Sequence, residues 1–259
     1  MTRFAANIGF LFREVPWLER FAAARSAGFD TVEFAWPTAP PDKVVAAVRG
    51  SGLAVALINM PAGDLDAGER GHTNDPRARD RWRRDFDAAI DLARSIGCPV
   101  VNVLAGNRVD DIPRDAQLAC VRENLAWALP RAREARVQLV VELLNPTDSP
   151  RYLVTSLAAT VELLDAFDGA GLRLQFDTYH VAQVAPDVTT AFRELAGQIG
   201  HVQVADFPGR HEPGTGGIDW DEFFGALDDA GYEGAVGLEY VPTGATPDAL
   251  NWLGRRTTA

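Results

Sequence analysis

Cysteine and histidine are scarce in this sequence of 259 residues, which contains two cysteines and four histidines. Cys98 and Cys120 show no spacing typical of a metal site. So few cysteines are typical of proteins from a reducing compartment, where thiols are not paired. We therefore expect two free, buried thiols.

Long hydrophobic runs and an excess of positive charge are also missing. No stretch approaches the roughly 18 apolar residues of a membrane helix. The apolar run at 4–12 is short and is followed by Arg13 and Glu14, which does not fit a secretory signal. The formal net charge of −11 disfavours nucleic acid or an anionic membrane surface as the main partner. These features predict a cytoplasmic protein, in which a small anion can still bind where positive side chains gather.

Short apolar runs rich in β-branched residues alternate along the whole chain with longer amphipathic segments. The clearest helical pattern covers 75–96, where one apolar stripe faces away from the charged residues. The expected strands are 4–9, 31–34, 54–58, 100–104, 138–142, 173–177, 201–205 and 235–239.

Eight strands that alternate with helices predict a single (β/α)8 TIM barrel of the α/β class, over residues 1–254, followed by a disordered tail at 255–259. The alternative is a doubly wound sheet, which would carry a glycine-rich phosphate loop after its first strand. The residues after the first run, Gly-Phe-Leu-Phe at 9–12, are not such a loop. Two long segments without a helical pattern, 59–74 and 206–217, follow strands, and loops of this length in a compact domain are usually functional.

Four oxygen-bearing side chains stand at or near the carboxyl ends of consecutive strands: Glu142, Asp177, Gln203 and Glu239. The gaps between them are 35, 26 and 36 residues, close to the roughly 30 residues of a βαβ unit. Parallel strands direct their carboxyl ends to one face, so these four side chains are expected to converge. Three carboxylates and an amide oxygen around one point form a hard ligand set that suits Mg²⁺ or Mn²⁺.

A hard metal ion flanked by two glutamates suits proton transfer next to a carbonyl. The ion would polarise a carbonyl and the neighbouring hydroxyl, and Glu142 or Glu239 would remove the carbon-bound proton. The resulting cis-enediolate would be stabilised by the metal until a proton returns to the adjacent carbon. This scheme predicts an aldose–ketose type isomerisation without an organic cofactor, and leaves open which glutamate acts first.

Arg70, Arg210 and His211 lie on the two long loops and are candidates to bind an anionic substrate. For each arginine the alternative is a salt bridge that orders its own loop. His180 follows Asp177 by three residues, a spacing that could direct its ring at a substrate oxygen. His201 is expected to face the same side of its strand as the glutamine two residues later and to serve as a core or supporting residue.

The motifs of this chain resemble the hydroxypyruvate isomerase family of the xylose isomerase-like barrels. The resemblance covers almost the whole chain and is specific when the fragments are taken together. It is carried by Arg3 to Asn7, Glu14-Val15-Pro16, Gly68 to Gly71, Glu142 with Asn145-Pro146, Asp177 with Tyr179-His180, His201 to Gln203, Arg210 to Pro213 with Thr215-Gly216, and Gly237 to Tyr240.

The resemblance implies interconversion of hydroxypyruvate and tartronate semialdehyde. It also implies that Glu142 and Glu239 are the proton donor and acceptor, and that both bind the metal with Asp177 and Gln203. Three positions depart from the family pattern, because histidine, proline and glutamate are usual in that family where this chain has Asn102, Leu143 and Gly217. None of these departures removes an expected metal ligand.

Other functions stay open from sequence alone. The related 2-oxo-tetronate isomerases share nearly all of these motifs, and a 3-epimerase or a dehydratase on the same barrel would also start from an enolate. A nuclease of the same superfamily is disfavoured, because such enzymes hold several zinc ions largely through histidines. A non-catalytic sugar-acid binding protein is the alternative of a different class. We expect a small hydroxy-oxo acid as the substrate, and a homo-oligomer is possible.

Overall fold

Eight short runs of apolar and β-branched residues form parallel strands that close into a barrel in sequence order. The computed structural model describes residues 2–256, and the expected (β/α)8 barrel is confirmed, while the doubly wound alternative is wrong. The strands are β1 (Arg3–Asn7), β2 (Thr31–Phe34), β3 (Ala54–Asn59), β4 (Val100–Asn102), β5 (Gln138–Glu142), β6 (Arg173–Asp177), β7 (Ile199–Val204) and β8 (Ala235–Leu238).

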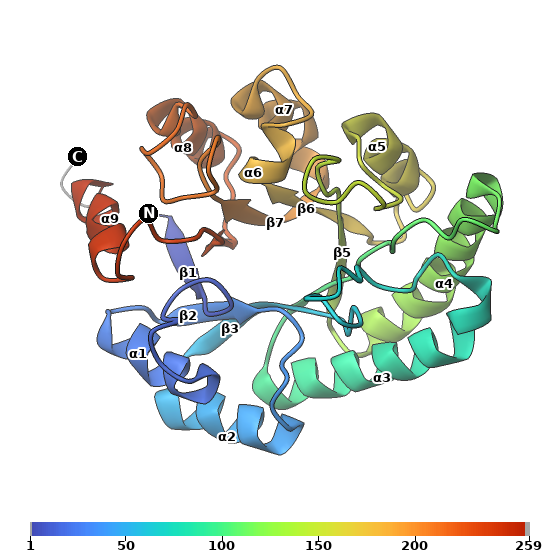
Figure 1. The fold of residues 1–259 in the computed structure, drawn as a ribbon, viewed down its shortest axis with the longest axis horizontal. Helices are drawn as coiled ribbons and strands as arrows, with labels where there is room; N and C mark the ends of the chain where they lie inside the picture. Colours follow the sequence, from blue (N-terminus) through green and yellow to red (C-terminus); the bar gives the residue numbers. More distant parts are fainter. Residues whose placement is uncertain (1, 257–259) are drawn as a thin grey trace.

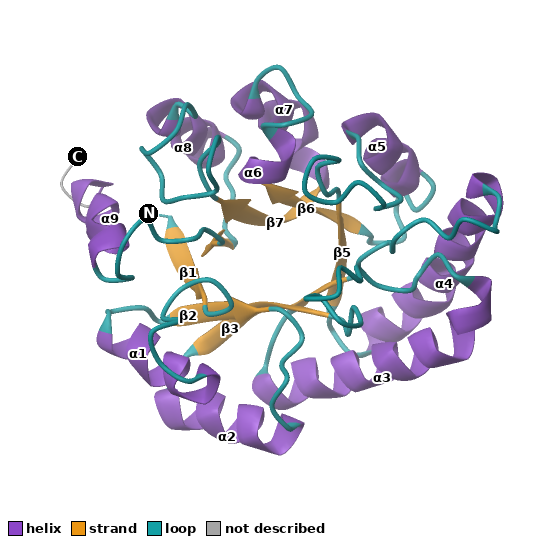
Figure 2. Cartoon of the chain, viewed as in Figure 1, coloured by secondary structure: helices purple, strands orange, loops and turns teal. Residues whose placement is uncertain are grey.

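Helices surround the barrel on its outside (Figure 1), and the strands lie inside this ring (Figure 2). The α-helices are α1 (Arg20–Ser26), α2 (Pro41–Ser51), α3 (Arg79–Ile96), α4 (Arg114–Glu134), α5 (Leu157–Asp165), α6 (Thr178–Val181), α7 (Val188–Leu195), α8 (Trp220–Asp229) and α9 (Asn251–Arg256). Short 3₁₀ helices are η1 (Trp17–Glu19), η2 (Pro76–Ala78), η3 (Ala196–Gln198) and η4 (Asp248–Leu250). Among the described residues, no helix is both long enough and apolar enough to cross a membrane.

Most strand boundaries agree with the sequence to within two residues. β4 ends at Asn102 instead of residue 104, and β8 ends one residue before Glu239. The segment expected to be a disordered tail, 255–259, begins inside α9, because the backbone of that helix continues to residue 256. The rest of that segment, 257–259, lies outside the described residues.

The amphipathic pattern at 75–96 forms η2 and α3, as the sequence predicted. Asp75 caps the start of this segment, since its side chain accepts a hydrogen bond from the backbone N–H of Arg77. Gly97 ends α3 in the left-handed conformation that glycine adopts without steric cost. The apolar stripe packs in the layer between the helices and the barrel, where Trp82 and Phe86 contact Trp127 of α4 edge to face.

The start of α8 is capped in a similar way, because the side chain of Asp219 accepts a hydrogen bond from the backbone N–H of Glu222. Phe223 and Phe224 are fully buried on this helix and belong to the core. The two thiols, Cys98 and Cys120, are free and buried, as predicted.

The inside of the barrel is polar towards the carboxyl ends of its strands. Side chains alternate along a strand, so one set packs outward against the helices and the other points into the barrel. Gly237 of β8 leaves room inside the barrel, because a Cβ atom at this position would overlap the carboxylate of Glu33 on β2. This polar upper layer is the base of the candidate site.

Candidate functional site

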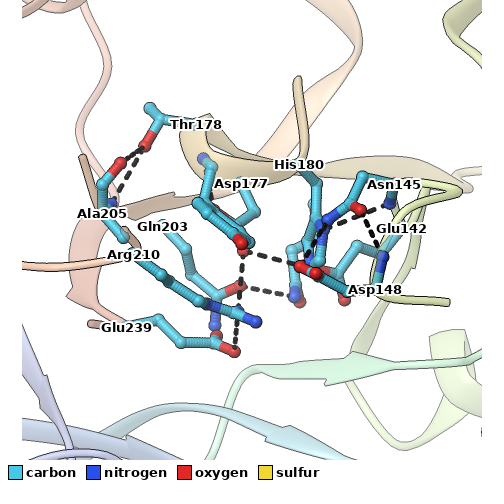
Figure 3. Close-up of polar contacts among 12 residues, drawn as sticks. Glu142, Asn145, Asp148, Asp177, Thr178, His180, Gln203, Ala205, Arg210 and Glu239 are labelled. Carbon is cyan, nitrogen blue, oxygen red and sulfur yellow. Dashed lines mark hydrogen bonds and ion pairs between the residues drawn. The ribbon is translucent and has the colours of Figure 1, made fainter. Parts of the chain in front are cut away.

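β5, β6 and β7 place three of the four expected ligands in the upper part of the barrel. The register pairs Asp177 of β6 with Gln203 of β7, and Glu142 of β5 with Gln175 of β6. Glu142, Asp177 and Gln203 are all buried. Asp177 and Gln203 are thus direct neighbours across β6 and β7, and Glu142 lies beside the residue two positions before Asp177. Figure 3 shows that they converge from adjacent strands.

Glu142, Asp177 and His180 form a buried group whose ligand atoms all lie within 4.8 Å of one another. The Nε2 atom of His180 lies 3.9 Å from Oε1 of Glu142 and 3.6 Å from Oδ2 of Asp177. This group could hold a metal ion. His180 is on α6, the single helical turn that follows β6, and Asp177 caps that turn by accepting a hydrogen bond from the backbone N–H of Tyr179.

Glu239 joins this group through Arg210. One guanidinium nitrogen of Arg210 donates to Oε1 of Glu239 at 2.8 Å and to Oδ2 of Asp177 at 3.2 Å. Arg210 is thus an internal counter-charge for two of the expected ligands, and its ion pairs do not merely order its own loop. The expected convergence of Glu142, Asp177, Gln203 and Glu239 is visible in Figure 3.

The position of Arg210 is closely defined by its surroundings. Its guanidinium lies over the ring of Phe10 at 4.8 Å and over the ring of Tyr179 at 4.9 Å, so two aromatic rings contact it by cation–π interactions. Its backbone has a φ of 55°, a left-handed conformation that is uncommon for a residue with a side chain. Such conformations persist where the surroundings determine them, and they are frequent at functional sites.

Burial and like charges raise the pKa values of the three carboxyl groups. Burial raises the pKa of Glu142 to about 8, and the charge of Asp177 adds to this effect. Burial likewise raises the pKa of Asp177 to about 6, although the positive charge of Arg210 opposes it. The pKa of Glu239 is raised well above its ordinary value, first by burial and then by Asp177 and Glu142, against the opposing charge of Arg210. The three groups therefore interact electrostatically as one cluster.

The same burial acts in the opposite direction on the basic groups. It lowers the pKa of His180 well below its ordinary value, and the positive charges of Arg210 and Arg70 lower it further. Burial alone would lower the pKa of Arg210, but the attraction of Glu239, Asp177 and Glu142 raises it overall. At neutral pH the site thus contains a neutral imidazole and a charged guanidinium.

A second polar layer lies directly below the expected ligands and was missed by the sequence analysis. Its centre is Glu33 of β2, which is 0% exposed. Its carboxylate lies 2.6 Å from Nε2 of His201, and it accepts hydrogen bonds from Asn7 at 3.0 Å and from Gln203 at 2.7 Å. Asn7 also donates to Glu239 at 3.3 Å. This layer confirms the supporting role expected for His201.

The sequence does contain an indication that Glu33 belongs to a polar cluster inside the barrel. It is an acidic residue inside the run Thr-Val-Glu-Phe, which forms one of the eight barrel strands. A carboxylate in such a strand needs polar partners inside the barrel, because an unpaired buried charge is costly. Only the closed barrel shows that those partners come from β1 and β7, since their residues are far from Glu33 in the sequence.

The two other candidates on the long loops contact backbone carbonyl groups. One terminal nitrogen of Arg70 donates to the backbone carbonyls of Leu65 and Glu69, which orders its own loop by hydrogen bonds. Arg70 also lines a cavity of about 730 Å³ between the loops that follow β3, β4 and β5, together with Asp148. His211 contacts the backbone carbonyl of Val241 at 2.7 Å through Nδ1, which links its loop to the segment after β8.

The three departures from the family pattern differ in their relation to the site. Asn102 of β4 donates a hydrogen bond to Oε2 of Glu142 at 2.9 Å, so it contacts a candidate catalytic group directly. Leu143 is a buried core residue, and Gly217 lies on an exposed part of its loop. Of the three departures, asparagine at position 102 is therefore the one that would affect the proton transfer expected of Glu142.

A divalent metal ion fits the residues present. Carboxylate and amide oxygens form a hard donor set, and a cation between the buried carboxylates would relieve their mutual repulsion. The Oε1 atom of Gln175 and the Oδ1 atom of Asn102 are buried without a hydrogen-bond partner among residues 2–256. Such orphaned acceptors beside Glu142 and Gln203 match a site that receives a cation or the hydroxyl groups of a ligand.

The sequence and the structure both have close counterparts among known proteins. The chain is 36% identical over 254 residues to the 2-oxo-tetronate isomerase of Haemophilus influenzae, with 98% of each chain covered. It is 35% identical over 254 residues to the hydroxypyruvate isomerase of Escherichia coli, again with 98% of each covered.

Among solved structures, the barrel is similar to the crystal structure of an AP endonuclease, family 2, from Brucella melitensis. The TM-score is 0.93 at 33% identity, and 98% of this chain and 99% of the other are covered. The family model described as xylose isomerase-like TIM barrel matches residues 21–256. With the closed parallel barrel and its carboxylates at the strand ends, this protein is a member of the xylose isomerase-like TIM-barrel family.

Proposed function

We propose that the protein is an isomerase that interconverts hydroxypyruvate and tartronate semialdehyde (2-hydroxy-3-oxopropanoate). The observation that carries this proposal is the arrangement of the buried Glu142 and the partly buried Glu239 on either side of Asp177 (Figure 3). The raised pKa of each glutamate allows it to accept and return a proton near neutral pH. The names of the relatives at 35% and 36% identity support the same reaction class.

Substrate binding is assigned to the positive and donor groups around the carboxylates. Arg210 supplies a guanidinium that can pair with the substrate carboxylate, because its planar fork matches carboxylate geometry. His180 offers its Nε2 atom, which lies 3.6 Å from Asp177 on the side opposite to Arg210 (Figure 3). Arg70 lines the cavity between the loops that follow β3, β4 and β5, and His211 belongs to the loop that carries Arg210.

Proton transfer proceeds in two steps. One glutamate removes a proton from C3 of hydroxypyruvate, which leaves an enediolate with its negative charge on the C2 oxygen. A proton is then delivered to C2, and the proton of the C3 hydroxyl passes to the C2 oxygen, so that the C3 oxygen becomes the aldehyde carbonyl and the C2 oxygen becomes a hydroxyl. Asn102 donates a hydrogen bond to Glu142 and so stabilises the charged form of that base.

The metal ion of this site would be held by Glu142, Asp177, Gln203 and Glu239, and we propose Mg²⁺ or Mn²⁺ because all of these ligands are oxygens. When bound, such an ion polarises the substrate carbonyl and stabilises negative charge. Arg210 would then be released from the carboxylates to contact the substrate anion. Activity on hydroxypyruvate before and after chelation, with Mg²⁺ and Mn²⁺ added back, measures this requirement.

Turnover of hydroxypyruvate in D₂O, followed by proton NMR, tests the proposed reaction. Isomerisation places solvent deuterium at C2 of tartronate semialdehyde and, in the reverse direction, at C3 of hydroxypyruvate. A 3-epimerase or a dehydratase, tested on longer sugar acids, would instead invert another carbon or release water. Binding without any exchange of a carbon-bound proton would indicate a non-catalytic binding protein and would refute the proposal.

Glu239→Gln provides the matched variant, because it keeps the shape of the side chain and removes its basicity. We expect kcat to fall by a factor of about 100 or more, since general acid–base groups contribute about 10²- to 10⁴-fold. Loss of substrate binding with unchanged kcat would assign Glu239 to binding alone.

The second candidate substrate is a 2-oxo-tetronate, which has one more carbon. The observation that favours it is the similarity to relatives that carry this name. The relative from Haemophilus influenzae carries that name at 36% identity. The ratio of kcat/KM for the three-carbon and four-carbon acids decides between them.

A nuclease is not proposed, although the similar structure from Brucella melitensis is described as an endonuclease. The net charge of −11 opposes the approach of a polyanion. Within the described part of the chain, the His/Cys/Asp/Glu group that could hold a metal contains two carboxylates and a single histidine.

A further inference from the structure

The ring of His180 is hydrogen-bonded on the side that faces away from the carboxylates. Its Nδ1 atom lies 3.2 Å from the backbone nitrogen of Asn145 and 2.8 Å from the side-chain nitrogen of the same residue. Asn145 is 0% exposed, so water does not compete for these contacts. Figure 3 shows Asn145 beside the ring, on the loop that follows β5.

The orientation of the Asn145 side chain is defined by the backbone of Asp148. The N–H of Asp148 donates to the Asn145 atom 2.8 Å away, which must therefore be the amide oxygen. The amide nitrogen then faces His180 and also donates to Oδ2 of Asp148 at 3.0 Å. A backbone N–H can only donate, so this assignment does not depend on the placement of the amide atoms.

Two N–H groups thus point at Nδ1 of His180, and a nitrogen that accepts a hydrogen bond carries no hydrogen of its own. The hydrogen of the neutral ring is then on Nε2, the atom that lies 3.6 Å from Asp177 and 3.9 Å from Glu142. In that tautomer Nε2 has no free lone pair. It can donate a hydrogen bond into the site, but it cannot bind a metal ion.

We propose that Asn145 is a positioning residue that holds His180 as the Nε2–H tautomer, so that the ring acts as a hydrogen-bond donor in the site and not as a metal ligand. The role in turnover rests on the proposed function, whereas the tautomer itself can be measured without substrate. A donor at this place stabilises negative charge on a substrate oxygen bound between Glu142 and Asp177.

Nitrogen NMR of protein labelled with ¹⁵N-histidine tests the tautomer directly, because the chain contains four histidines. The signals of His180 are assigned from their absence in His180→Gln. We expect its Nε2 to show a directly bonded hydrogen and its Nδ1 to resonate as an unprotonated nitrogen. An unprotonated Nε2 overturns the inference, whether or not the protein isomerises hydroxypyruvate.

Addition of Mg²⁺ alone extends this test to the metal site. We expect Nε2 of His180 to keep its hydrogen at saturating Mg²⁺, because the ion binds to the oxygen ligands. Loss of that hydrogen on addition of Mg²⁺ would make His180 a ligand and overturn the inference. Failure of the proposed isomerase activity would leave both NMR results unaffected, so the two proposals fail separately.

Asn145→Ala removes the side-chain donor and leaves the backbone N–H in place. We expect part of the His180 population to move to the Nδ1–H tautomer, and kcat to fall by about 10- to 100-fold, as for other residues that orient a site group. Asn124→Ala is the matched control, since Asn124 is a buried asparagine of α4 that donates to the backbone carbonyl of Thr73. The control should keep the tautomer and kcat, and an Asn145→Ala variant that also keeps both overturns the positioning role.

Discussion

A single nitrogen of Arg210 contacts Glu239 at 2.8 Å and Asp177 at 3.2 Å, and thereby joins the carboxyl ends of β6 and β8. The guanidinium is the internal cation of a buried acidic cluster. A metal ion that binds these oxygens has to share them with Arg210 or displace it. Arg210 therefore neutralises part of the negative charge that the metal ion implied by the family resemblance would otherwise neutralise.

Arg210→Gln removes this counter-charge and is expected to destabilise the metal-free protein. Breaking a buried ion pair by removing one partner costs about 3 kcal/mol or more, because the remaining charge is left uncompensated. We expect Mg²⁺ or Mn²⁺ to restore more stability to the variant than it adds to the wild type. Urea denaturation in a chelator and at saturating metal measures both effects. Equal stabilisation of the two proteins by metal would contradict this prediction.

Arg193→Gln is the control for this experiment. Arg193 forms an ion pair with Glu222 at 2.8 Å on the surface, where both side chains are about half exposed. Exposed pairs contribute about 0 to 1 kcal/mol, so the variant should unfold almost like the wild type. Its response to metal should match that of the wild type.

Metal binding should strengthen as pH rises. Burial raises the pKa of Asp177 from 3.8 to about 6 and that of Glu142 from 4.5 to about 8. Between the ordinary and the raised values the native state holds more protons than the unfolded state, so the stability of the metal-free protein falls as pH rises through this window. A metal ion requires the ionised carboxylates and displaces those protons.

Isothermal titration calorimetry measures how metal binding depends on proton release. Mg²⁺ or Mn²⁺ is titrated at several pH values from 6 to 8, the window set by the two raised pKa values of Asp177 and Glu142. The dissociation constant should decrease with pH, and comparison of buffers with different ionisation enthalpies should reveal proton release. A dissociation constant that does not change with pH would contradict the assignment of Glu142 and Asp177 as ligands.

Asn102→Ala should shift the pH dependence of turnover. The hydrogen bond from Asn102 to Glu142 favours the charged form and lowers the pKa of that glutamate. Without it the pKa of Glu142 rises further, so the base is ionised only at higher pH. The rising limb of the kcat/KM profile is expected to move to higher pH in the variant. An unchanged profile would show that Glu142 is not the group that titrates in turnover.

Glu33→Ala should weaken metal binding although Glu33 is not an expected ligand. Its carboxylate accepts a hydrogen bond from the side-chain nitrogen of Gln203, which turns the oxygen of that amide away from Glu33 and towards Gln175, whose side-chain nitrogen donates to it at 2.6 Å. Residues that orient a ligand in this way contribute about 10- to 100-fold to metal affinity. Titration with Mn²⁺ measures the loss, and an unchanged affinity would exclude a role for Glu33 in orienting Gln203.

Periodicity and strand-end chemistry were enough to predict the barrel and its carboxylates. Short β-branched runs at regular spacing predicted the strands, and a polar residue at the end of a buried run is visible without a structure. Glu33 was not found, because its partners Asn7, Gln203 and His201 come from two other strands. The contact of Asn102 with Glu142 was equally hidden, since 40 residues separate them in the chain.

Local sequence alone determines the order of strands and helices, because hydrophobic period and strand length act over a few residues. This order also determines the shared edge of the barrel that carries Glu142, Asp177, Gln203 and Glu239. Which atoms meet at that edge was decided only by closure of the barrel. Closure brings the loop after β7 against the ends of β6 and β8, so that Arg210 pairs with the carboxylates, and it brings the loop after β5 against α6. These contacts depend on the stagger of neighbouring strands and on desolvation inside the barrel, which no single segment of the chain contains.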